Sequence, residues 1–447
     1  MGEKPVLSLL VSMSLPMMLS MLVQSLYNIV DSMYVSWLGT EALTAVSLAY
    51  PLQNIVMAVS VGIGVGISSA LSIRLGEKDQ EKANETATVG MALTLVHCVV
   101  FVLFGLVVTR PFLKLFTDSP EVLDSACEYT YVVLCVSFGS LLQIAMEKIY
   151  QGIGAMKTTM VLLATGCIIN IILDPVLIFG LLGFPAMGVK GAAIATVIGQ
   201  IGAFLLYLVA YLRKNPGVTI HPRYLRMDGA LIKKIYAVGI PSTLMLMMPS
   251  LLISALNGIL AAFSGVYVAV LGVYFKLQTF IYMPANGMVQ GMRPIIGFNY
   301  GAGQYGRVRQ TIRYCLAGAA AIMLVGTVLS LAVPGGILQL FQADPELLAA
   351  GETALRIISL GFPVSTAGVV FSGVFEALGR GGESLVISLL RQLAITVPLG
   401  FLLSRWLGAV GIWIAFPVAE LAASVAAVIL LLRYRNGVFF PWGEKDA

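Results

Sequence analysis

Long apolar stretches alternate with short polar ones along the whole chain, and glycine, proline or charged residues mark the changes. About 20 consecutive apolar residues cross a bilayer as one helix. The pattern predicts twelve membrane-spanning helices, at residues 7–36, 44–74, 86–109, 122–147, 157–182, 188–212, 232–258, 264–297, 308–333, 346–376, 384–405 and 408–433. The one long polar stretch, from Arg213 to Lys234, is basic and separates the sixth predicted helix from the seventh.

The second half of the chain repeats the first at an offset of 225 residues. The corresponding pairs are Pro16 and Pro241, Gly62 and Gly287, Gly66 and Gly291, Gly76 and Gly301, and Gly154 and Gly379. The run LFTDSPEVL at Leu115 likewise corresponds to LFQADPELL at Leu340. After a shorter loop the offset becomes 220, which pairs Gly188, Gly191 and Ala195 with Gly408, Gly411 and Ala415. We therefore expect two six-helix lobes, 1–220 and 221–447.

Each half has an even number of predicted helices, so both halves begin on the same side of the membrane. This arrangement implies a pseudo-twofold axis along the membrane normal. Most Lys and Arg residues fall on the side of both termini, whereas Arg110, Lys114, Lys190 and Arg405 fall on the other. Because basic loops stay inside, we expect both termini to be cytoplasmic. Two such lobes around a cleft suit alternating access, and a repeat that serves only as a packed scaffold is the alternative.

The composition agrees with an all-α integral membrane protein. Only 11% of the residues are charged and 58% are hydrophobic, whereas about 25% are charged in soluble proteins. The five cysteines lie in apolar stretches without metal-ligand spacing, the two histidines are His97 and His221, and no phosphate-binding glycine–lysine loop is present. These features argue against an intramembrane enzyme and an ATP-driven pump, and we expect no cofactor. The basic residues are spread over several loops, which argues against a nucleic-acid partner.

Two carboxylates, Asp31 and Asp174, lie inside predicted helices. An ionised carboxylate at mid-membrane costs about 2.5–3.5 kcal/mol, so each needs a partner or a function. At 1.5 Å per residue, Asp31 lies about 9 Å below Trp37 and Thr196 about 12 Å below Gly188. Asp174 lies at a similar depth.

The residues beside these carboxylates are polar. Asn170 shares a helical face with Asp174, and Ala192 shares one with Thr196. We expect an oxygen-rich site for sodium or a proton, formed by Asp31, Asn170, Asp174 and Thr196 with a freed backbone carbonyl, and we count Ala192 among its residues. Two alternatives stay open: Asp174 as the cap of a helix restarting at Pro175, and Asp31 as a buried residue with a structural partner.

The remaining candidates concern movement and substrate binding. Pro16 lacks an amide hydrogen, which predicts a first helix that bends, although a static kink is equally compatible. Flexible thioethers and aromatic faces suit a cavity for flat cations, and ordinary packing is the alternative. The predicted cavity residues are Gln24, Asn28, Met248, Tyr274, Lys276, Met283 and Met288. Glu147 and Glu376 are expected to reach water near helix ends, whereas Arg293, Arg391 and Glu420 have no assignable partners.

Four segments together carry a resemblance to a known family. They are SLPMMLSMLVQSLYNIVDSMYV at Ser14, NIILDPVLIFG at Asn170, GVKGAAIATVIGQ at Gly188 and RPIIGFNYGA at Arg293. The chain resembles the multidrug and toxic compound extrusion (MATE) transporters, and among them the MepA-like branch, from about Pro5 to Arg435.

The resemblance implies a two-lobe fold of twelve helices and export of organic cations in exchange for protons or sodium. It also implies that Asp31, Asn170, Asp174 and Thr196 form a cation site of the first lobe and that Pro16 is the bending proline. The stretch from Ile235 to Phe263 has no acidic residue, which argues against a sodium site there. We expect a monomer in the plasma membrane of a bacterium or archaeon. An exporter or flippase of a dedicated metabolite or lipid-linked substrate is the alternative.

Overall fold

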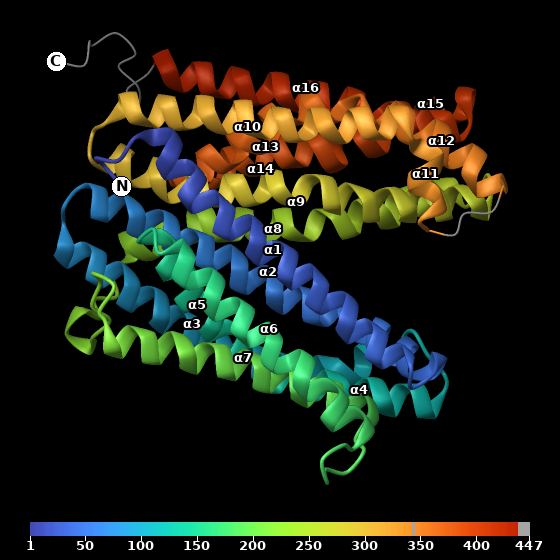
Figure 1. The fold of residues 1–447 in the computed structure, drawn as a ribbon, viewed down its shortest axis with the longest axis horizontal. Helices are drawn as coiled ribbons and strands as arrows, with labels where there is room; N and C mark the ends of the chain where they lie inside the picture. The colour runs from blue at the N-terminus through green and yellow to red at the C-terminus, as the bar shows by residue number, and fades with distance from the viewer. Residues whose placement is uncertain (342–344, 437–447) are drawn as a thin grey trace. The chain divides into compact units, whose positions relative to one another are not determined.

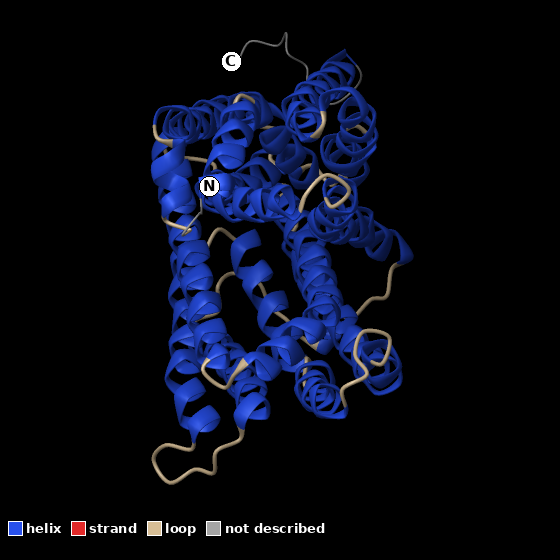
Figure 2. Ribbon diagram, turned by 90° about the vertical axis from the view of Figure 1, so that its right-hand side faces the viewer, coloured by secondary structure: helices blue, strands red, loops and turns tan. Residues whose placement is uncertain are grey.

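The computed structural model describes residues 1–341 and 345–436, without the side chains of 434–436, and every element in this part of the chain is a helix (Figure 2). Residues 342–344 of the run that starts at Leu340 lie outside it. Figure 1 labels most of the helices. The helices are α1 (Val6–Ser36), α2 (Thr40–Gly76), α3 (Gln80–Leu113), α4 (Pro120–Cys135), α5 (Phe138–Gly152), α6 (Met156–Phe179), α7 (Gly188–Arg213), η1 (Pro222–Tyr224), α8 (Gly229–Leu260), α9 (Gly265–Gly301), α10 (Tyr305–Ala332), α11 (Pro334–Gln339), α12 (Pro345–Ser359), α13 (Gly361–Ala377), α14 (Gly381–Leu389), the π-helix η2 (Leu390–Ala394), α15 (Thr396–Leu407) and α16 (Ala409–Asn436).

Most of these helices are long and apolar enough to cross a membrane. Ten meet that condition in the described residues, or up to twelve if the bent pairs α4–α5 and α12–α13 each form one span. The predicted all-α membrane fold is confirmed. The prediction of single continuous helices at 122–147 and 346–376 was wrong, because the pairs bend by 44° and 50°.

Each bend lies next to a glycine that another helix approaches closely. A Cβ added at Gly139 would lie 2.6 Å from Cγ1 of Ile201 in α7, and one at Gly361 would lie 3.0 Å from Cα of Pro417 in α16. Each bent pair is apolar enough to pass as one membrane span, so the apolar pattern alone did not reveal the bends.

The helices form two compact units, which differ from the predicted lobes 1–220 and 221–447. We call Leu19–Thr243 the N-terminal unit, and Met1–Met18 together with Leu244–Ala447 the C-terminal unit. Each unit therefore includes the beginning of the other half's first helix. The helices α1 and α8 pass from one unit to the other just after the equivalent prolines Pro16 and Pro241.

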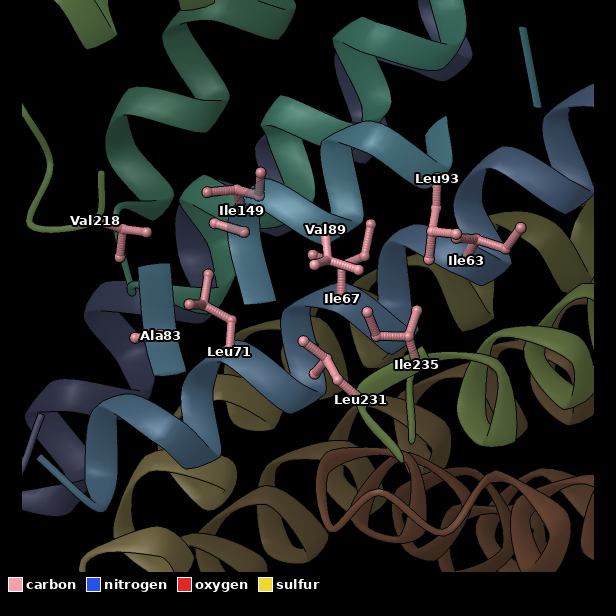
Figure 3. Close-up of a cluster of buried hydrophobic side chains, with 11 residues drawn as sticks. Ile63, Ile67, Leu71, Ala83, Val89, Leu93, Ile149, Val218, Leu231 and Ile235 are labelled. Atoms are coloured by element: carbon pink, nitrogen blue, oxygen red, sulfur yellow. The ribbon is translucent and has the colours of Figure 1, made fainter. Parts of the chain in front are cut away.

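In the N-terminal unit, two repeated glycines explain why the beginning of α8 belongs there. A Cβ at Gly66 would lie 2.2 Å from the carbonyl oxygen of Ile235, and one at Gly62 would lie 2.7 Å from that of Gly239. The side chain of Ile235 is fully buried beside Ile67 in an apolar cluster (Figure 3). Small residues spaced by four let membrane helices approach at backbone distance.

The C-terminal unit contains the equivalent crossing. A Cβ at Gly291 would lie 2.7 Å from Cα of Ser14, and one at Gly287 would lie 2.9 Å from Cα of Met18. The hydroxyl of Ser14 also donates to the carbonyl oxygen of Met288, at 3.3 Å. The offset of 225 relates these contacts to those of Gly66 and Gly62, so the repeat extends to the helix crossings.

These crossings predict a stability effect. We expect Gly66→Ala to destabilise the protein by about 1–3 kcal/mol, because the new methyl group meets backbone that cannot rotate away. The melting temperature of the purified protein should fall accordingly. Gly272→Ala is the matched control, since a Cβ at Gly272 in α9 meets nothing within 4 Å. Equal melting temperatures for the two variants would contradict the close crossing.

Candidate functional site

The N-terminal unit contains a cavity of about 430 Å³. This volume lies within the range of about 300–1,000 Å³ that is typical of ligand sites. Its lining includes seven amide-bearing side chains, which are Gln24, Asn28, Gln53, Asn54, Gln143, Asn170 and Gln200. Asp31 is the one charged side chain among the described residues that line it. The cavity lining is therefore rich in amide groups and contains a single acidic side chain.

Four predicted polar residues meet at this cavity. Asn170 Nδ2 donates to Asp174 Oδ1 at 3.3 Å and to Thr196 Oγ1 at 3.4 Å. The carboxyl of Asp31 lies within hydrogen-bonding reach of that of Asp174. Asp174 is fully buried, whereas Asp31, Asn170 and Thr196 line the cavity. We call these four residues the N-terminal cation cluster.

Three oxygens of this cluster are buried and make no hydrogen bond within the described residues: Asp31 Oδ1, Asn170 Oδ1 and Asp174 Oδ2. A buried polar atom without a partner costs about 1–3 kcal/mol. A hard cation takes oxygen ligands of this kind, and a proton held between the two carboxyls would satisfy two of them. The donor set therefore fits a monovalent cation or a proton.

Close packing between α6 and α7 brings the cluster together. A Cβ at Gly199 would lie 3.0 Å from Cβ of Asn170, and one at Gly166 would lie 2.7 Å from Cβ of Ala203. The glycines thus let Asn170 approach Thr196. The helix α6 continues through Pro175, so the alternative that Asp174 caps a restarting helix was wrong.

Sequence reasoning missed several residues of the site. Tyr27 hydrogen-bonds to Thr196, and the Tyr129 hydroxyl donates to Gln53 Oε1 at 3.5 Å. Both tyrosines line the cavity. Tyr27 lies four residues before Asp31 and so on the same face of α1, which was the available signal. Tyr129 had none, because hydropathy does not separate it from the apolar core of α4.

Other predicted site residues are placed as follows. Gln24 and Asn28 line the cavity. Ala192 packs in an apolar cluster that includes Val35 and Tyr129, and a role for its carbonyl stays a prediction. Pro16 lies inside α1, in the C-terminal unit.

The predicted substrate residues of the second half do not line this cavity. Tyr274, Met248 and Met283 are at most 7% exposed, Met288 is half-buried and Lys276 is exposed. The ring of Tyr274 packs 5.3 Å from that of Phe416. For the three buried residues, the alternative of ordinary packing describes this conformation, since their side chains are buried.

The acidic residues near helix ends are buried, so the prediction that they reach water was wrong. Glu147 Oε1 accepts from Gln151 Nε2 at 2.8 Å and from Lys148 Nζ at 3.3 Å. Glu376 forms an ion pair with Arg293. Each carboxylate has a cation beside it, which offsets the cost of burial.

Comparison with known proteins gives consistent results. The profile of the family described as MatE matches residues 16–176 and 241–402. The multidrug export protein MepA of Staphylococcus haemolyticus is 26% identical over 97% of this chain and 95% of its own. The probable multidrug resistance protein YoeA of Bacillus subtilis is 30% identical over 97% and 94%. A solved structure of the MATE multidrug transporter DinF-BH is similar with a TM-score of 0.87, at 34% identity and 96% coverage of both chains.

Proposed function

Because this chain belongs to the MATE family, as a MepA-like member, we propose that it is a secondary active multidrug exporter. It moves organic cations out of the cell in exchange for protons or sodium. The family match over both halves and the names of the relatives support export of drugs. The exchange reaction rests on the geometry of the N-terminal unit.

One observation carries the exchange: Asp31 belongs to both the cavity and the N-terminal cation cluster. Its side chain lines the cavity, and its carboxyl reaches that of Asp174. A drug cation that pairs with Asp31 and a coupling cation that binds beside Asp174 therefore need the same carboxylate. Binding of the coupling cation lowers the affinity of the cavity for the drug, and release of that cation restores the affinity. Such competition is sufficient for antiport when the cavity faces each side of the membrane in turn.

The cavity lining also indicates the substrate class. Aromatic rings of Tyr27, Tyr50 and Tyr129 and the carboxylate of Asp31 suit flat organic cations, because aromatic faces attract positive charge. The amide groups adapt to varied hydrogen-bonding patterns. A lipid-linked or anionic metabolite would instead need Lys or Arg in the lining. We therefore favour organic cations over that alternative.

We further propose that α1 bends at Pro16 when a coupling cation binds to or leaves the N-terminal cation cluster. The helix leaves the C-terminal unit just after this proline and carries Asp31 within the N-terminal unit. Pro16→Ala is expected to slow ethidium efflux from proteoliposomes several-fold while leaving ethidium affinity unchanged, because the alanine restores a backbone hydrogen bond. An unchanged efflux rate would exclude a hinge at this position.

Transport assays decide the coupling ion. The purified protein is reconstituted in proteoliposomes loaded with ethidium, and a proton or a sodium gradient is imposed separately. We expect one of these gradients to drive uphill movement of ethidium and its collapse to stop it. Movement that ignores both gradients would overturn the proposed exchange. The full proposal places a monomer with cytoplasmic termini in the plasma membrane of a bacterium or archaeon.

A further inference from the structure

The C-terminal unit contains a buried ion pair between two membrane helices. Arg391 Nε donates to Glu420 Oε1 at 2.7 Å, and the two side chains are 17% and 10% exposed. The guanidinium lies over the ring of Tyr282, 5.2 Å from its centroid. The Tyr282 hydroxyl in turn donates to Ser365 Oγ at 2.8 Å. We call these four residues the C-terminal ion-pair cluster.

The internal repeat relates this cluster to the cavity of the N-terminal unit. At the offset of 225, Tyr282, Ser365 and Arg391 correspond to Met57, Ser140 and Gly166, and at the offset of 220, Glu420 corresponds to Gln200. All four counterparts line the cavity. The ion pair thus fills, in the C-terminal unit, the place that is open in the N-terminal unit.

Packing contacts support this correspondence. Gly166 faces α7 at Gly199 and Ala203, where a Cβ would lie 3.3 Å from the Gly199 carbonyl oxygen and 2.7 Å from Ala203 Cβ. Arg391 faces α16 at Glu420, whose counterpart Gln200 lies between those two contacts. Positions 166 and 391 are therefore structurally equivalent. Glycine leaves this place open in the N-terminal unit, and the arginine side chain fills it in the C-terminal unit.

The backbone around Arg391 is also specialised. Residues Leu390–Ala394 form a π-helix, and Thr396 Oγ1 donates to the carbonyl oxygen of Arg391 at 2.7 Å. The helix α6, which holds Gly166, is α-helical from Met156 to Phe179. Single π turns between α-helical segments are frequent at functional sites. The π-helix is therefore present around Arg391 in the second repeat and absent from the equivalent helix α6 of the first.

The counterparts of the N-terminal cation cluster are apolar. At the same offsets, Asp31, Asn170 and Asp174 correspond to Leu256, Ile395 and Leu399, and Thr196 corresponds to Phe416. Leu256 is fully buried and Phe416 is 6% exposed. These positions offer no side-chain oxygen to a small cation. In this unit, the Arg391 guanidinium instead neutralises the negative charge of Glu420.

We propose that Arg391 is a built-in cation, which holds Glu420 permanently and prevents the C-terminal unit from exchanging an ion. The protein then has one exchangeable cation site, in the N-terminal unit, and Arg391 sets the number of cations exchanged per drug. This inference rests on the proposed function, since the exchangeable site is the N-terminal cation cluster. Arg391 is a positioning residue that acts through Glu420.

The test uses the full-length protein and the residues that the first repeat carries at these positions. In Arg391→Gly, Glu420 loses its partner and takes up a proton in a sodium-free buffer, because an uncompensated buried charge is costly. Labelling of Glu420 by dicyclohexylcarbodiimide, which reacts with protonated carboxyls, should rise by about tenfold or more relative to the unmodified protein. The double variant R391G/E420Q reproduces Gly166 and Gln200 and should fold without a labelled group at 420. Arg391→Met, which fills the same space, replaces R391G in the assay if R391G does not fold.

A second readout separates this role from a purely structural one. The number of protons or sodium ions exchanged per ethidium should rise in R391G or R391M and return to the original value in R391G/E420Q. A ratio that stays constant in every variant, or equal labelling of Glu420 with and without Arg391, would overturn the proposal. The labelling needs no transport, so its result stands even if the proposed exchange at Asp174 fails.

Discussion

Asp174→Asn is expected to reduce gradient-driven ethidium efflux to background, a loss of about thirtyfold or more. The carboxyl is fully buried, accepts a hydrogen bond from Asn170 and lies beside Asp31. The amide keeps the shape of the side chain but removes the charge that, in the proposed exchange, holds the coupling cation, and losing a buried charged partner costs about 2–5 kcal/mol. Efflux from proteoliposomes under an imposed gradient measures the effect.

The matched control for this variant is Asp124→Asn, the same chemical change in α4. The side chain of Asp124 is 70% exposed and its contact with Arg110 is 3.9 Å long, so we expect normal efflux. A melting temperature of the Asp174 variant close to that of the unmodified protein shows that the variant is folded. Unimpaired efflux by the folded Asp174 variant would remove Asp174 from the site.

Asp31→Asn is expected to uncouple drug movement from the ion gradient. Because Asp31 is shared by the cavity and the N-terminal cation cluster, its loss removes the competition between the two cations. Ethidium should then equilibrate across the membrane and no longer accumulate against its gradient, and its affinity should fall through loss of the charge. The assay follows ethidium distribution while the proton or sodium gradient is reversed.

One contradicting result and one control variant test the role of Asp31. Ethidium movement by the Asp31 variant that still follows the direction of the imposed gradient would contradict the sharing of this residue. Ser36→Ala, an exposed position on α1 whose hydroxyl donates to the carbonyl oxygen of Met33 at 2.7 Å, serves as the control and should leave coupling intact, since Ser36 does not line the cavity.

The sequence predicted the helical fold well because a bilayer imposes a fixed length and an apolar surface on each span. The predicted stretch 7–36 differs from α1 by a single residue at its start. The bends after Cys135 and Ser359 were not predictable in this way, since each bent pair passes as one apolar span and the close approach of another helix beside each bend is visible only in the fold. Hydropathy records exposure to lipid, and it carries no information on which helix is approached.

The N-terminal cation cluster was also accessible from sequence, because buried carboxylates in a membrane are rare and costly. Helical spacing placed Asn170 beside Asp174, and the hydrogen bond between them follows that spacing. The partners contributed by distant helices could not be predicted from helical spacing. Tyr129 was hidden among the apolar residues of α4, and Glu420 is 29 residues from Arg391, so only the fold brings these partners together.

The exchange of helix beginnings between the units illustrates the same limit. The repeat in sequence identified Gly62, Gly66, Gly287 and Gly291 as equivalent positions, but it did not give their partners. The partners lie in the first helix of the opposite half, at Ile235 and Ser14 among others. The lobes 1–220 and 221–447 stay a prediction from sequence order, whereas the compact units of the structure group the start of each first helix with the opposite half.

Competition between coupling cation and drug is the central claim, and equilibrium binding tests it most directly. Fluorescence polarisation measures ethidium affinity of the purified protein over a series of sodium concentrations and, separately, of pH values. We predict that affinity falls as one of these cations is raised and that Asp174→Asn abolishes the dependence while ethidium still binds. An affinity that stays constant across both series in the unmodified protein, or a dependence that persists without the Asp174 carboxylate, would contradict the account.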